Sequence, residues 1–479
     1  MTQPTPPQDD SPQADAPEGA KKSVVEIQQV YYTGLEIENV RCFQEKQKLN
    51  LADENGQWAR WTLLLGDNGV GKTSLLRGLL LLSPVQDGDL ISPFFFKIFP
   101  VGFKFLLRDP EKKFQIAATY ESGGVRSDIS CSGTGSRAHG QEIFFPIYDE
   151  SGGEFSVEWS YGKDGRSGKG ITFRDNGRHV KFKYTGLMKA YSANRFLDKE
   201  KGSVEDIGND NHLLTEDIPL INPEKWLLRA DYAARIESPF QERARARMEM
   251  IKQTLTDLLP DVEEIRIAPP QKLNEQPRTE FKTPYGWVRF DGLSLGYRAM
   301  MGWVVDLAAR MFDHYPESPN PLAEPAVVLV DEIDLHLHPK WQRRIMGYLS
   351  ERFPQTQFIA TAHSPLIAQA ADDRTNIAVL RREGDHVVID NNPENVRNWR
   401  VDQILSSDLF GVPLRSEEVE RLMAERARIL SKSRLSAQDK SRLRQLEEAI
   451  GEPPVGESKA DREAMAILRA AAAHLKPGA

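Results

Sequence analysis

Residues 66–73 read Gly-Asp-Asn-Gly-Val-Gly-Lys-Thr, between the apolar run Thr62–Leu65 and a stretch that predicts a helix over Thr73–Leu82. The pattern is G-x-x-x-x-G-K-[ST] in the strand–loop–helix context of a phosphate-binding loop. Glycines let backbone N–H groups converge on phosphate oxygens, and the helix N-terminus adds partial positive charge. We therefore expect bound ATP and Mg2+ here. The predicted nucleotide-binding residues of this loop are Gly66, Asn68, Gly69, Gly71, Lys72, Thr73 and Ser74.

A second segment supplies the acids that such a site needs. The apolar run Ala326–Val330 suits a strand buried on both faces of a parallel sheet, and Asp331 and Glu332 follow it directly. Asp331 can hold Mg2+ beside Thr73, and Glu332 is placed to polarise the attacking water. The alternative is an ordinary acidic turn after a strand. The phosphate loop earlier in the chain makes this alternative less favoured.

Two further segments resemble motifs of the ABC-type ATPases. Residues 293–298, Leu-Ser-Leu-Gly-Tyr-Arg, resemble the signature motif in a form seen in members that are not transporters. His363, directly after the predicted strand Phe358–Thr361, resembles the switch histidine. The resemblance implies that Ser294 and Gly296 bind the γ-phosphate of a second subunit's nucleotide, and that His363 contacts the γ-phosphate. It also implies an α/β ATPase head with a mixed or parallel central sheet, an antiparallel β region and a helical subdomain.

Other residues narrow the resemblance to one group of these ATPases. His338, in Leu-His-Pro at 337–339, resembles the D-loop of the OLD-like, AAA_21-type members, and implies nucleotide contact. Arg41 resembles the N-terminal arginine of RecF- and SMC-type heads, which lies close to bound nucleotide; an exposed strand-end arginine is the alternative. Residues 190–195 resemble a further element of the group whose role we leave open. A Q-loop glutamine is not assigned, although Gln115 is a candidate.

The chain divides into segments by composition. A disordered tail is expected over 1–22, which is rich in proline and acids. The ATPase head is expected over 23–399. Within it, period-two alternation predicts antiparallel strands over 95–190, and a helical period predicts an insertion over 222–260. A helical accessory region is expected over 400–479.

Several local elements are also predicted. A single helix is expected over Trp341–Phe353, and a hairpin turn between two strands over Arg381–Ile389. The accessory region predicts a helical hairpin connected by Ser431–Asp439, serving as a cap on the head or as a docking site for a partner. Its apolar positions recur at helical spacing: Val419, Leu422, Ala427, Leu430, Leu443, Leu446 and Ile450.

Composition excludes several classes of protein. The chain has 479 residues, 62 Lys plus Arg, 70 Asp plus Glu and a net charge of −8, which argues against a uniformly basic nucleic-acid coat. Two cysteines exclude a disulfide framework. No apolar run approaches the length of a membrane span, and no signal pattern begins the chain, so we expect a cytoplasmic protein without membrane contact.

The spacing of the motifs distinguishes among the families of related ATPases. The stretch between Lys72 and Asp331 is too short for the coiled-coil arm of an SMC-type protein. Residues 220–227 and 402–411 resemble segments of the Septu ATPase family, PtuA, including retron-associated versions. That resemblance implies nucleotide-dependent pairing of subunits, as a homodimer or higher homo-oligomer. It further implies regulation of an effector, an HNH nuclease of the PtuB type, in bacterial anti-phage defence.

A RecF-like DNA-binding repair ATPase is the alternative function. It would use basic clusters for nucleic acid contact, although a solvated helix face explains such clusters as well. The two clusters are Arg243, Arg245 and Arg247, and Lys340, Arg343 and Arg344.

Overall fold

The computed structural model describes most of the chain between its termini. The described residues are 23–27, 30–82, 108, 113–122, 125–134, 147–148, 154–158, 172–175, 178–184, 186–198, 202–204, 213, 219–393, 399–407, 409–411, 415–432 and 436–450. The predicted tail, residues 1–22, lies outside them. The chain forms two compact units, Met1–Val401 and Asp402–Ala479, and each is described by itself.

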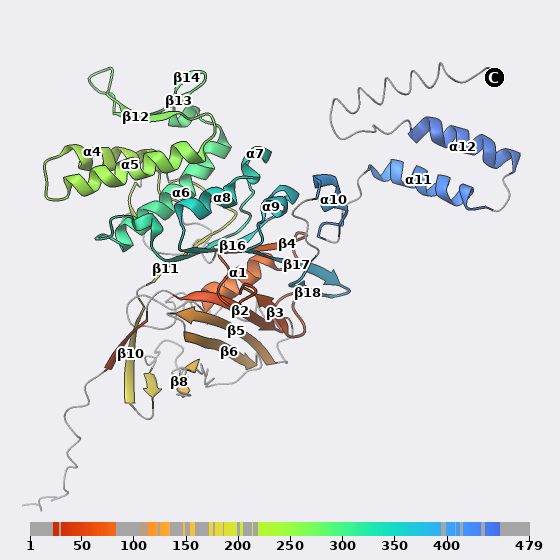
Figure 1. Cartoon of the computed structure of the whole chain (residues 1–479), viewed down its shortest axis with the longest axis horizontal. Coiled ribbons are helices and arrows are strands. Elements are labelled where there is room, and N and C mark those ends of the chain that lie inside the picture. Colours follow the sequence, from red (N-terminus) through yellow and green to blue (C-terminus); the bar gives the residue numbers. More distant parts are fainter. Residues whose placement is uncertain are drawn as a thin grey trace, which may run out of the picture. The chain divides into compact units, whose positions relative to one another are not determined.

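A mixed sheet lies at the centre of the first unit (Figure 1). Its strands run in the order β11 (Leu187–Tyr191), β15 (Ala326–Val330), β16 (Thr356–Thr361), β4 (Trp61–Gly66), β17 (Thr375–Glu383) and β18 (His386–Asp390). The first five strands are parallel, and β18 pairs antiparallel with β17, which confirms the predicted hairpin. Every residue of β15 and β16 is buried, as a strand covered on both faces requires.

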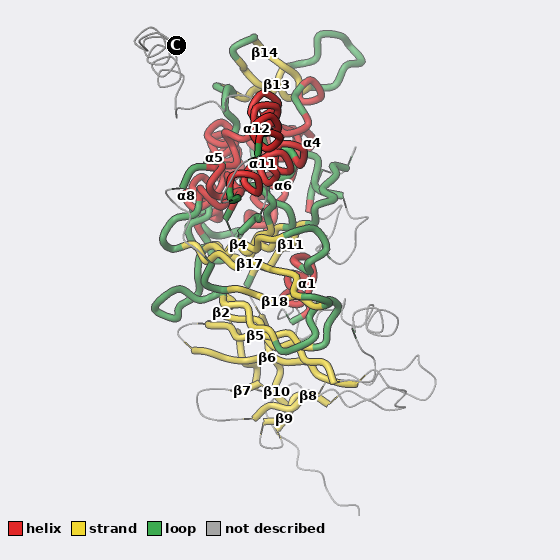
Figure 2. Tube along the Cα trace, turned by 90° about the vertical axis from the view of Figure 1, so that its right-hand side faces the viewer, coloured by secondary structure: helices red, strands yellow, loops and turns green. Residues whose placement is uncertain are grey.

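Helices cover both faces of this sheet (Figure 2). Helix α1 (Lys72–Leu81) lies on one face, between the central sheet and the antiparallel strands. The other face carries α4 (Pro223–Arg235), α5 (Gln241–Leu258), α6 (Leu295–His314), α7 (Pro339–Gln342), α8 (Ile345–Arg352) and α9 (Pro365–Ala370). Asn222 starts α4 by accepting hydrogen bonds from the backbone N–H groups of Glu224 and Lys225, with Pro223 at the first helical position.

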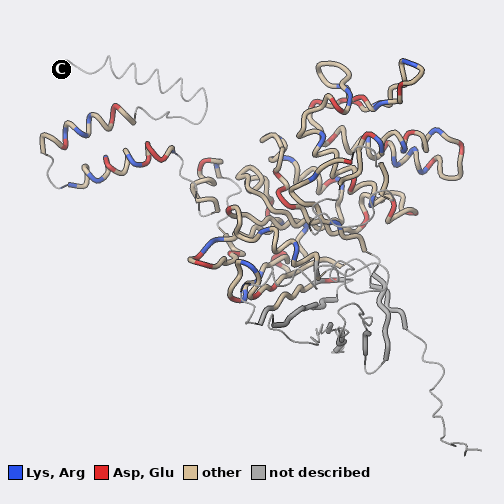
Figure 3. The backbone as a smooth tube through the Cα atoms, turned by 180° about the vertical axis from the view of Figure 1, so that it is seen from behind, with Lys and Arg blue, Asp and Glu red and all other residues tan. Residues whose placement is uncertain are grey.

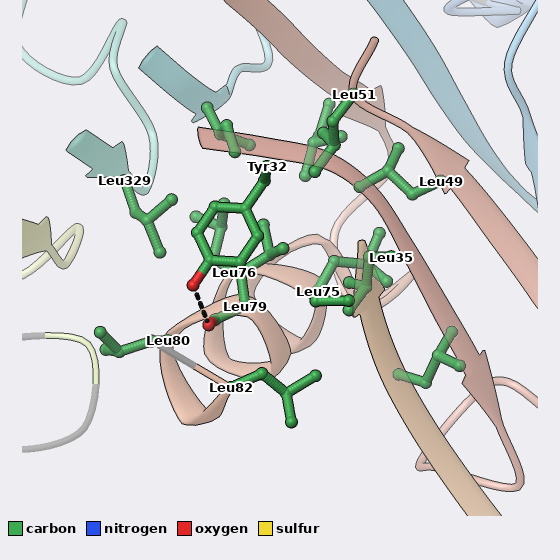
Figure 4. Close-up of a cluster of buried hydrophobic side chains, with 14 of the residues drawn as sticks. Tyr32, Leu35, Leu49, Leu51, Leu75, Leu76, Leu79, Leu80, Leu82 and Leu329 are labelled. Atoms are coloured by element: carbon green, nitrogen blue, oxygen red, sulfur yellow. Dashed lines mark hydrogen bonds between the residues drawn. The ribbon is translucent and has the colours of Figure 1, made fainter. Parts of the chain in front are cut away.

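A four-stranded antiparallel sheet packs against the far side of α1. Its order is β3 (Gln47–Asn50), β2 (Tyr31–Glu38), β5 (Lys113–Ser122) and β6 (Val125–Thr134). Leu75, Leu76 and Leu79 of α1 are buried against Leu35 of β2, and the Tyr32 hydroxyl donates to the Leu79 carbonyl over 3.0 Å (Figure 4). This core holds the helix that begins at the phosphate loop.

Two further sheets complete the unit. One contains β12 (Glu264–Ala268), β13 (Arg278–Thr283) and β14 (Gly286–Arg289), followed by the short helices η1 (Phe290–Gly292) and, later, η2 (Pro321–Ala323). The other contains β1 (Ser23–Ile27), β10 (Arg178–Tyr184), β9 (Thr172–Asp175), β8 (Glu154–Glu158) and β7 (Ile147–Tyr148). The pairs β5–β6, β7–β8, β8–β9 and β9–β10 are antiparallel, as the alternating pattern predicts. The predicted α/β fold class is confirmed.

The first basic cluster lies on α5 and is largely neutralised. Arg243 forms a bidentate ion pair with Glu317, and Arg245 pairs with Glu242. Arg247 instead lies over the Phe312 ring at 5.4 Å. Basic and acidic residues alternate along the α4–α5 hairpin (Figure 3). The arrangement is that of a solvated, ion-paired helix face and gives little support to nucleic acid contact there.

One predicted helix is broken in two. The pattern over Trp341–Phe353 predicts a continuous helix, but α7 ends at Gln342 and α8 begins at Ile345. The Gln342 side chain donates to the Leu337 carbonyl and accepts from the Ser364 hydroxyl. The first turn is therefore held by the D-loop and by the loop after β16, contacts that helical periodicity cannot reveal.

The second unit contains a helical hairpin. Helix α10 (Val401–Ser406), which begins at the boundary, precedes α11 (Glu417–Leu430) and α12 (Ala437–Ile450). Ile429, Leu443 and Leu446 form its core, with Leu422 and Ile450 packed against them. The hairpin is thus confirmed, but α12 begins two residues before Asp439. Two of the predicted apolar positions, Ala427 and Leu430, are exposed, whereas Ile429 is buried.

Candidate nucleotide-binding site

The phosphate loop connects the end of β4 to the start of α1, in a conformation that needs glycine. Gly66, Gly69 and Gly71 have φ angles of 138°, 80° and 91°, in the range that side chains rarely adopt. A Cβ on Gly71 would also lie 2.4 Å from the Cys42 sulfur, and one on Gly66 would lie 2.5 Å from the Leu380 carbonyl oxygen. Backbone angle and close packing therefore exclude other residues at two of the three positions.

Lys72 and Thr73 open α1 at the base of the loop. The Lys72 ammonium donates to the carbonyls of Gly66 and Asp67, each over 2.8 Å. These two hydrogen bonds hold the start of the loop close to the ammonium. Burial lowers the pKa of Lys72, and the nearby carboxylates of Asp331 and Glu332 oppose that shift. The ammonium is therefore a buried cation near acids, suited to donate hydrogen bonds to phosphate oxygens.

The predicted magnesium ligands meet in this structure. The Thr73 hydroxyl donates to one Asp331 carboxylate oxygen over 2.8 Å, although the two residues lie far apart in the chain. Mg2+ prefers hard oxygen ligands and completes its shell with water and phosphate. These two side chains fit that role: they would hold the ion, which would neutralise phosphate charge. Among the described residues, no cluster of three or more His, Cys, Asp or Glu side chains forms a metal site.

Thr361, at the end of β16, organises the acids. Its hydroxyl donates to the other Asp331 carboxylate oxygen over 2.7 Å and accepts the Glu332 backbone N–H over 2.7 Å. Glu332 itself has a φ angle of 49°, in the left-handed region that a non-glycine residue rarely occupies. The neighbouring His363 donates its backbone N–H to Asp334 over 3.1 Å.

A pocket of about 570 Å3 lies over these residues. The predicted residues that line it are Arg41, Asn68, Gly69, Gly71, Lys72, Thr73, Ser74, Asp331, Glu332 and His363. Gly66 does not line it but supplies a carbonyl to Lys72. Residues from four separated stretches of sequence thus meet at the carboxyl ends of β4, β15 and β16, the edge where parallel sheets bind ligands.

The remaining predicted residues lie outside this pocket. Ser294 is exposed and caps α6, its hydroxyl accepting from the Tyr297 N–H over 3.5 Å. Gly296 packs against the D-loop, where a Cβ would come within 2.6 Å of the His336 carbonyl oxygen. His338 is exposed and caps α7 through the Lys340 N–H. Their nucleotide contacts stay predictions, which require a second subunit. Gln115, the Q-loop candidate, lies on β5 and does not line the pocket either.

Three residues that line the pocket were not predicted from the sequence: Cys42, Arg108 and Asp385. Arg108 forms an ion pair with Asp385 at 2.7 Å and donates to the Cys42 carbonyl over 3.4 Å. A hydrogen bond from His386 lowers the pKa of Asp385, as does the charge of Arg108. Beside them, burial and the charge of Arg77 lower the pKa of Arg41, whose φ angle is 50°. No local pattern marks Arg108, because its contacts come from Cys42 and from the β17–β18 turn, both distant in the chain.

Comparison with known proteins agrees with this geometry. Residues 281–368, which contain the signature, acidic strand and switch segments, match the AAA_21 family, described as an AAA domain, putative AbiEii toxin, Type IV TA system. Septu protein PtuA of Bacillus mycoides is 24% identical over 426 residues, covering 87% of this chain and 50% of that protein. The Retron Ec83 probable ATPase of Escherichia coli is 43% identical over 89 residues, 19% of this chain and 16% of that protein. The first unit resembles an ABC-type ATPase head, and among known proteins it resembles PtuA.

The extent of these similarities differs between relatives. The chain spans half the length of the B. mycoides PtuA, and much less of the retron protein. The SMC head domain from Thermotoga maritima is a structural neighbour, with a TM-score of 0.39, 15% identity, and coverage of 76% of this chain and 100% of that one. A TM-score of 0.39 is too low to support the fold. The fold is therefore assigned from the strand order and the geometry of the phosphate loop. None of the helices that the structure describes is both long enough and apolar enough to traverse a bilayer.

Proposed function

We propose that this chain binds and hydrolyses ATP with Mg2+, and that ATP-dependent pairing of two subunits regulates an effector in bacterial anti-phage defence. One observation carries the proposal: Lys72, Thr73 and Asp331 converge in one pocket, with Thr73 in direct contact with Asp331. Within the pocket, Glu332 would act as the base toward the attacking water, and His363 would contact the γ-phosphate.

The pairing of subunits is supported by where the signature segment lies. Ser294 and Leu295 are exposed and are not part of the pocket of their own chain. Exposed signature residues can reach a nucleotide only when another molecule presents its pocket. ATP would then act as a clamp between two subunits, and hydrolysis would release it.

The defence role is supported by the relatives. PtuA and a retron ATPase are similar to this chain, and both names belong to defence systems of the kind predicted from the sequence. The effector that we propose is an HNH nuclease of the PtuB type. A RecF-like DNA-binding ATPase remains the second candidate, because Lys340, Arg343 and Arg344 are exposed beside the D-loop.

Two substitutions test the nucleotide chemistry. Lys72→Ala removes the ammonium that faces the phosphates, so ATP binding and hydrolysis should both be lost. Glu332→Gln should retain ATP binding but reduce turnover by about 100-fold or more, because the amide cannot accept a proton from water. Binding of a fluorescent ATP analogue and release of phosphate are the measurements. Hydrolysis at the unmodified rate by purified Lys72→Ala protein would contradict the assignment of the loop.

Co-purification tests the partner. The chain is expressed together with candidate HNH nucleases, and complex formation and nuclease activity are compared with and without ATP. A complex whose nuclease activity responds to nucleotide supports the proposal. Repair proteins or DNA captured in place of a nuclease would favour the RecF-like alternative.

A further inference from the structure

The short segment after β11 is fixed between the acidic strand and the signature helix. The Tyr191 carbonyl accepts the backbone N–H of Asp331 over 2.8 Å, and the Tyr191 hydroxyl donates to Asp306 of α6 over 2.9 Å. Six residues after the end of β11, Leu197 packs into the space left by Gly302 of α6, where a Cβ would lie 2.4 Å from a Leu197 methyl carbon. The segment therefore has little freedom to move by itself.

Arg195 projects from this segment to the proposed catalytic acid. Its NH2 group donates to the Glu332 backbone carbonyl over 2.7 Å. That carbonyl also accepts the Leu335 N–H over 3.1 Å, and the Glu332 N–H is held by Thr361. Since Glu332 has a φ angle of 49°, its backbone is in a sparsely populated conformation that persists only when its surroundings hold it. Two of those holding groups are side chains, Arg195 and Thr361.

Arg195 is a charged side chain whose hydrogen bonding is incomplete. Burial lowers the pKa of Arg195 to about 10, while the carboxylates of Asp331, Glu332 and Asp334 favour its charged form. It is therefore a cation at neutral pH. Its NH1 atom is buried without a hydrogen-bond partner among the described residues, as is one carboxylate oxygen of Asp334. Packing alone would be better served by an apolar side chain, because a partly buried cation with an unpaired, buried NH1 atom is unfavourable.

We propose that Arg195 is a positioning residue for hydrolysis, which holds the Glu332 peptide so that the Glu332 carboxylate stays at the attacking water. The inference rests on the proposed ATP hydrolysis and on Glu332 as its base. Arg195 acts through Glu332, so its removal should impair turnover while nucleotide binding, which depends on the phosphate loop, continues.

The test compares Arg195→Ala and Arg195→Lys with the unmodified full-length chain. The matched control is Arg235→Ala, which removes an exposed arginine paired with Asp231 on α4. For each protein, kcat, KM and the Kd of a fluorescent ATP analogue are measured, with circular dichroism as the check on folding. For Arg195→Ala we expect kcat to fall by about 100-fold, the cost of a small misplacement, with Kd unchanged within about threefold. The control should retain its turnover.

Rescue separates positioning from packing. Arg195→Lys can keep one bond to the Glu332 carbonyl, so it should recover part of the lost kcat. Millimolar guanidinium should likewise raise the kcat of Arg195→Ala, because the free cation fits the space that the side chain leaves. If the Arg195→Ala variant does not fold, the Arg195→Lys variant provides the test. A reduced kcat at an unchanged Kd for ATP then supports positioning.

The possible failures are distinguishable. Absence of ATP turnover by the unmodified chain overturns the proposed function, and the inference with it. Turnover by the unmodified chain together with an unimpaired Arg195→Ala variant overturns the inference alone. Parallel loss of ATP binding and turnover, or no rescue by lysine or guanidinium, also overturns it, since both results indicate a merely structural arginine.

Discussion

At the scale of single residues, Thr361 connects the two acids of the site. One hydroxyl group bonds Asp331 and the backbone of Glu332, so it fixes the magnesium ligand and the proposed base together. Thr62, on the adjacent strand β4, offers a contrast: its hydroxyl is fully buried with no hydrogen-bond partner among the described residues. The two threonine hydroxyls on these neighbouring strands are therefore expected to affect stability in opposite directions: the paired one stabilises the fold and the unpaired one destabilises it.

Substitution by valine should expose this contrast. Thr361→Val leaves a buried Asp331 carboxylate oxygen and the part-buried Glu332 N–H without their partner, so the free energy of unfolding should fall by roughly 1–3 kcal/mol. ATP turnover should fall with it. Thr62→Val removes an unpaired hydroxyl, and the free energy of unfolding should change by less than about 0.5 kcal/mol or increase. Urea denaturation measures both. Equal losses in the two variants would reject the connecting role of Thr361.

At the scale of elements, the start of α6 packs directly on the D-loop. Gly296 lies against the His336 carbonyl, and Tyr297 meets the Trp341 ring edge-on at 4.6 Å. His336 has a φ angle of 64°, so this D-loop conformation is itself strained and depends on its neighbours. The signature segment and the D-loop therefore behave as one surface.

An added methyl group tests that packing. Gly296→Ala places a Cβ 2.6 Å from the His336 carbonyl oxygen. Because that oxygen belongs to the backbone, only a shift of the main chain can relieve the contact. We expect a loss of about 1–3 kcal/mol in unfolding free energy and reduced ATP turnover, with ATP binding retained. The control, Gly347→Ala in the exposed part of α8, meets no atom within 4 Å and should gain about 1 kcal/mol. A neutral Gly296→Ala would mean that the D-loop is not held by this contact.

At the scale of the whole molecule, the proposed site would be completed by Ser294 and Gly296 of a second subunit, because neither residue lines the pocket of its own chain. Mixing two defective subunits tests this. In a pair formed from Lys72→Ala and Ser294→Arg chains, one composite site carries both lesions and the other carries neither. ATP hydrolysis should therefore return toward about half the unmodified rate for such mixed pairs. If mixed pairs form but no activity returns, the signature segment does not act across the interface.

The second unit has its own small core, and none of its described residues lines the pocket over the phosphate loop. Deletion of residues 415–479 separates the two roles expected of this hairpin, a cap on the head and a docking site. Docking predicts that ATP binding stays intact while co-purification with the effector is lost. Gel filtration, nucleotide binding and co-purification together make the measurement. Misfolding of the truncated chain would indicate a structural cap, and an intact complex would reject docking.

Local sequence was sufficient wherever a short motif dictates its own geometry. The glycines at 66, 69 and 71 were predictable because backbone angles above zero and close approach to phosphate require them. The strand Ala326–Val330 was predictable to the residue because an uninterrupted apolar run has few other uses. Helix α1 followed from the position of Lys72 at the end of the loop.

Tertiary structure decided the rest, since the deciding contacts join residues distant in the chain. Thr361 reaches Asp331 only because β16 pairs with β15, and Arg195 reaches Glu332 only because β11 pairs with β15 on its other side. Strand order is set by how helices and sheets cover one another, not by any local pattern. A threonine at a strand end or an arginine in a loop is ordinary in sequence, and only its neighbours in space give it a function.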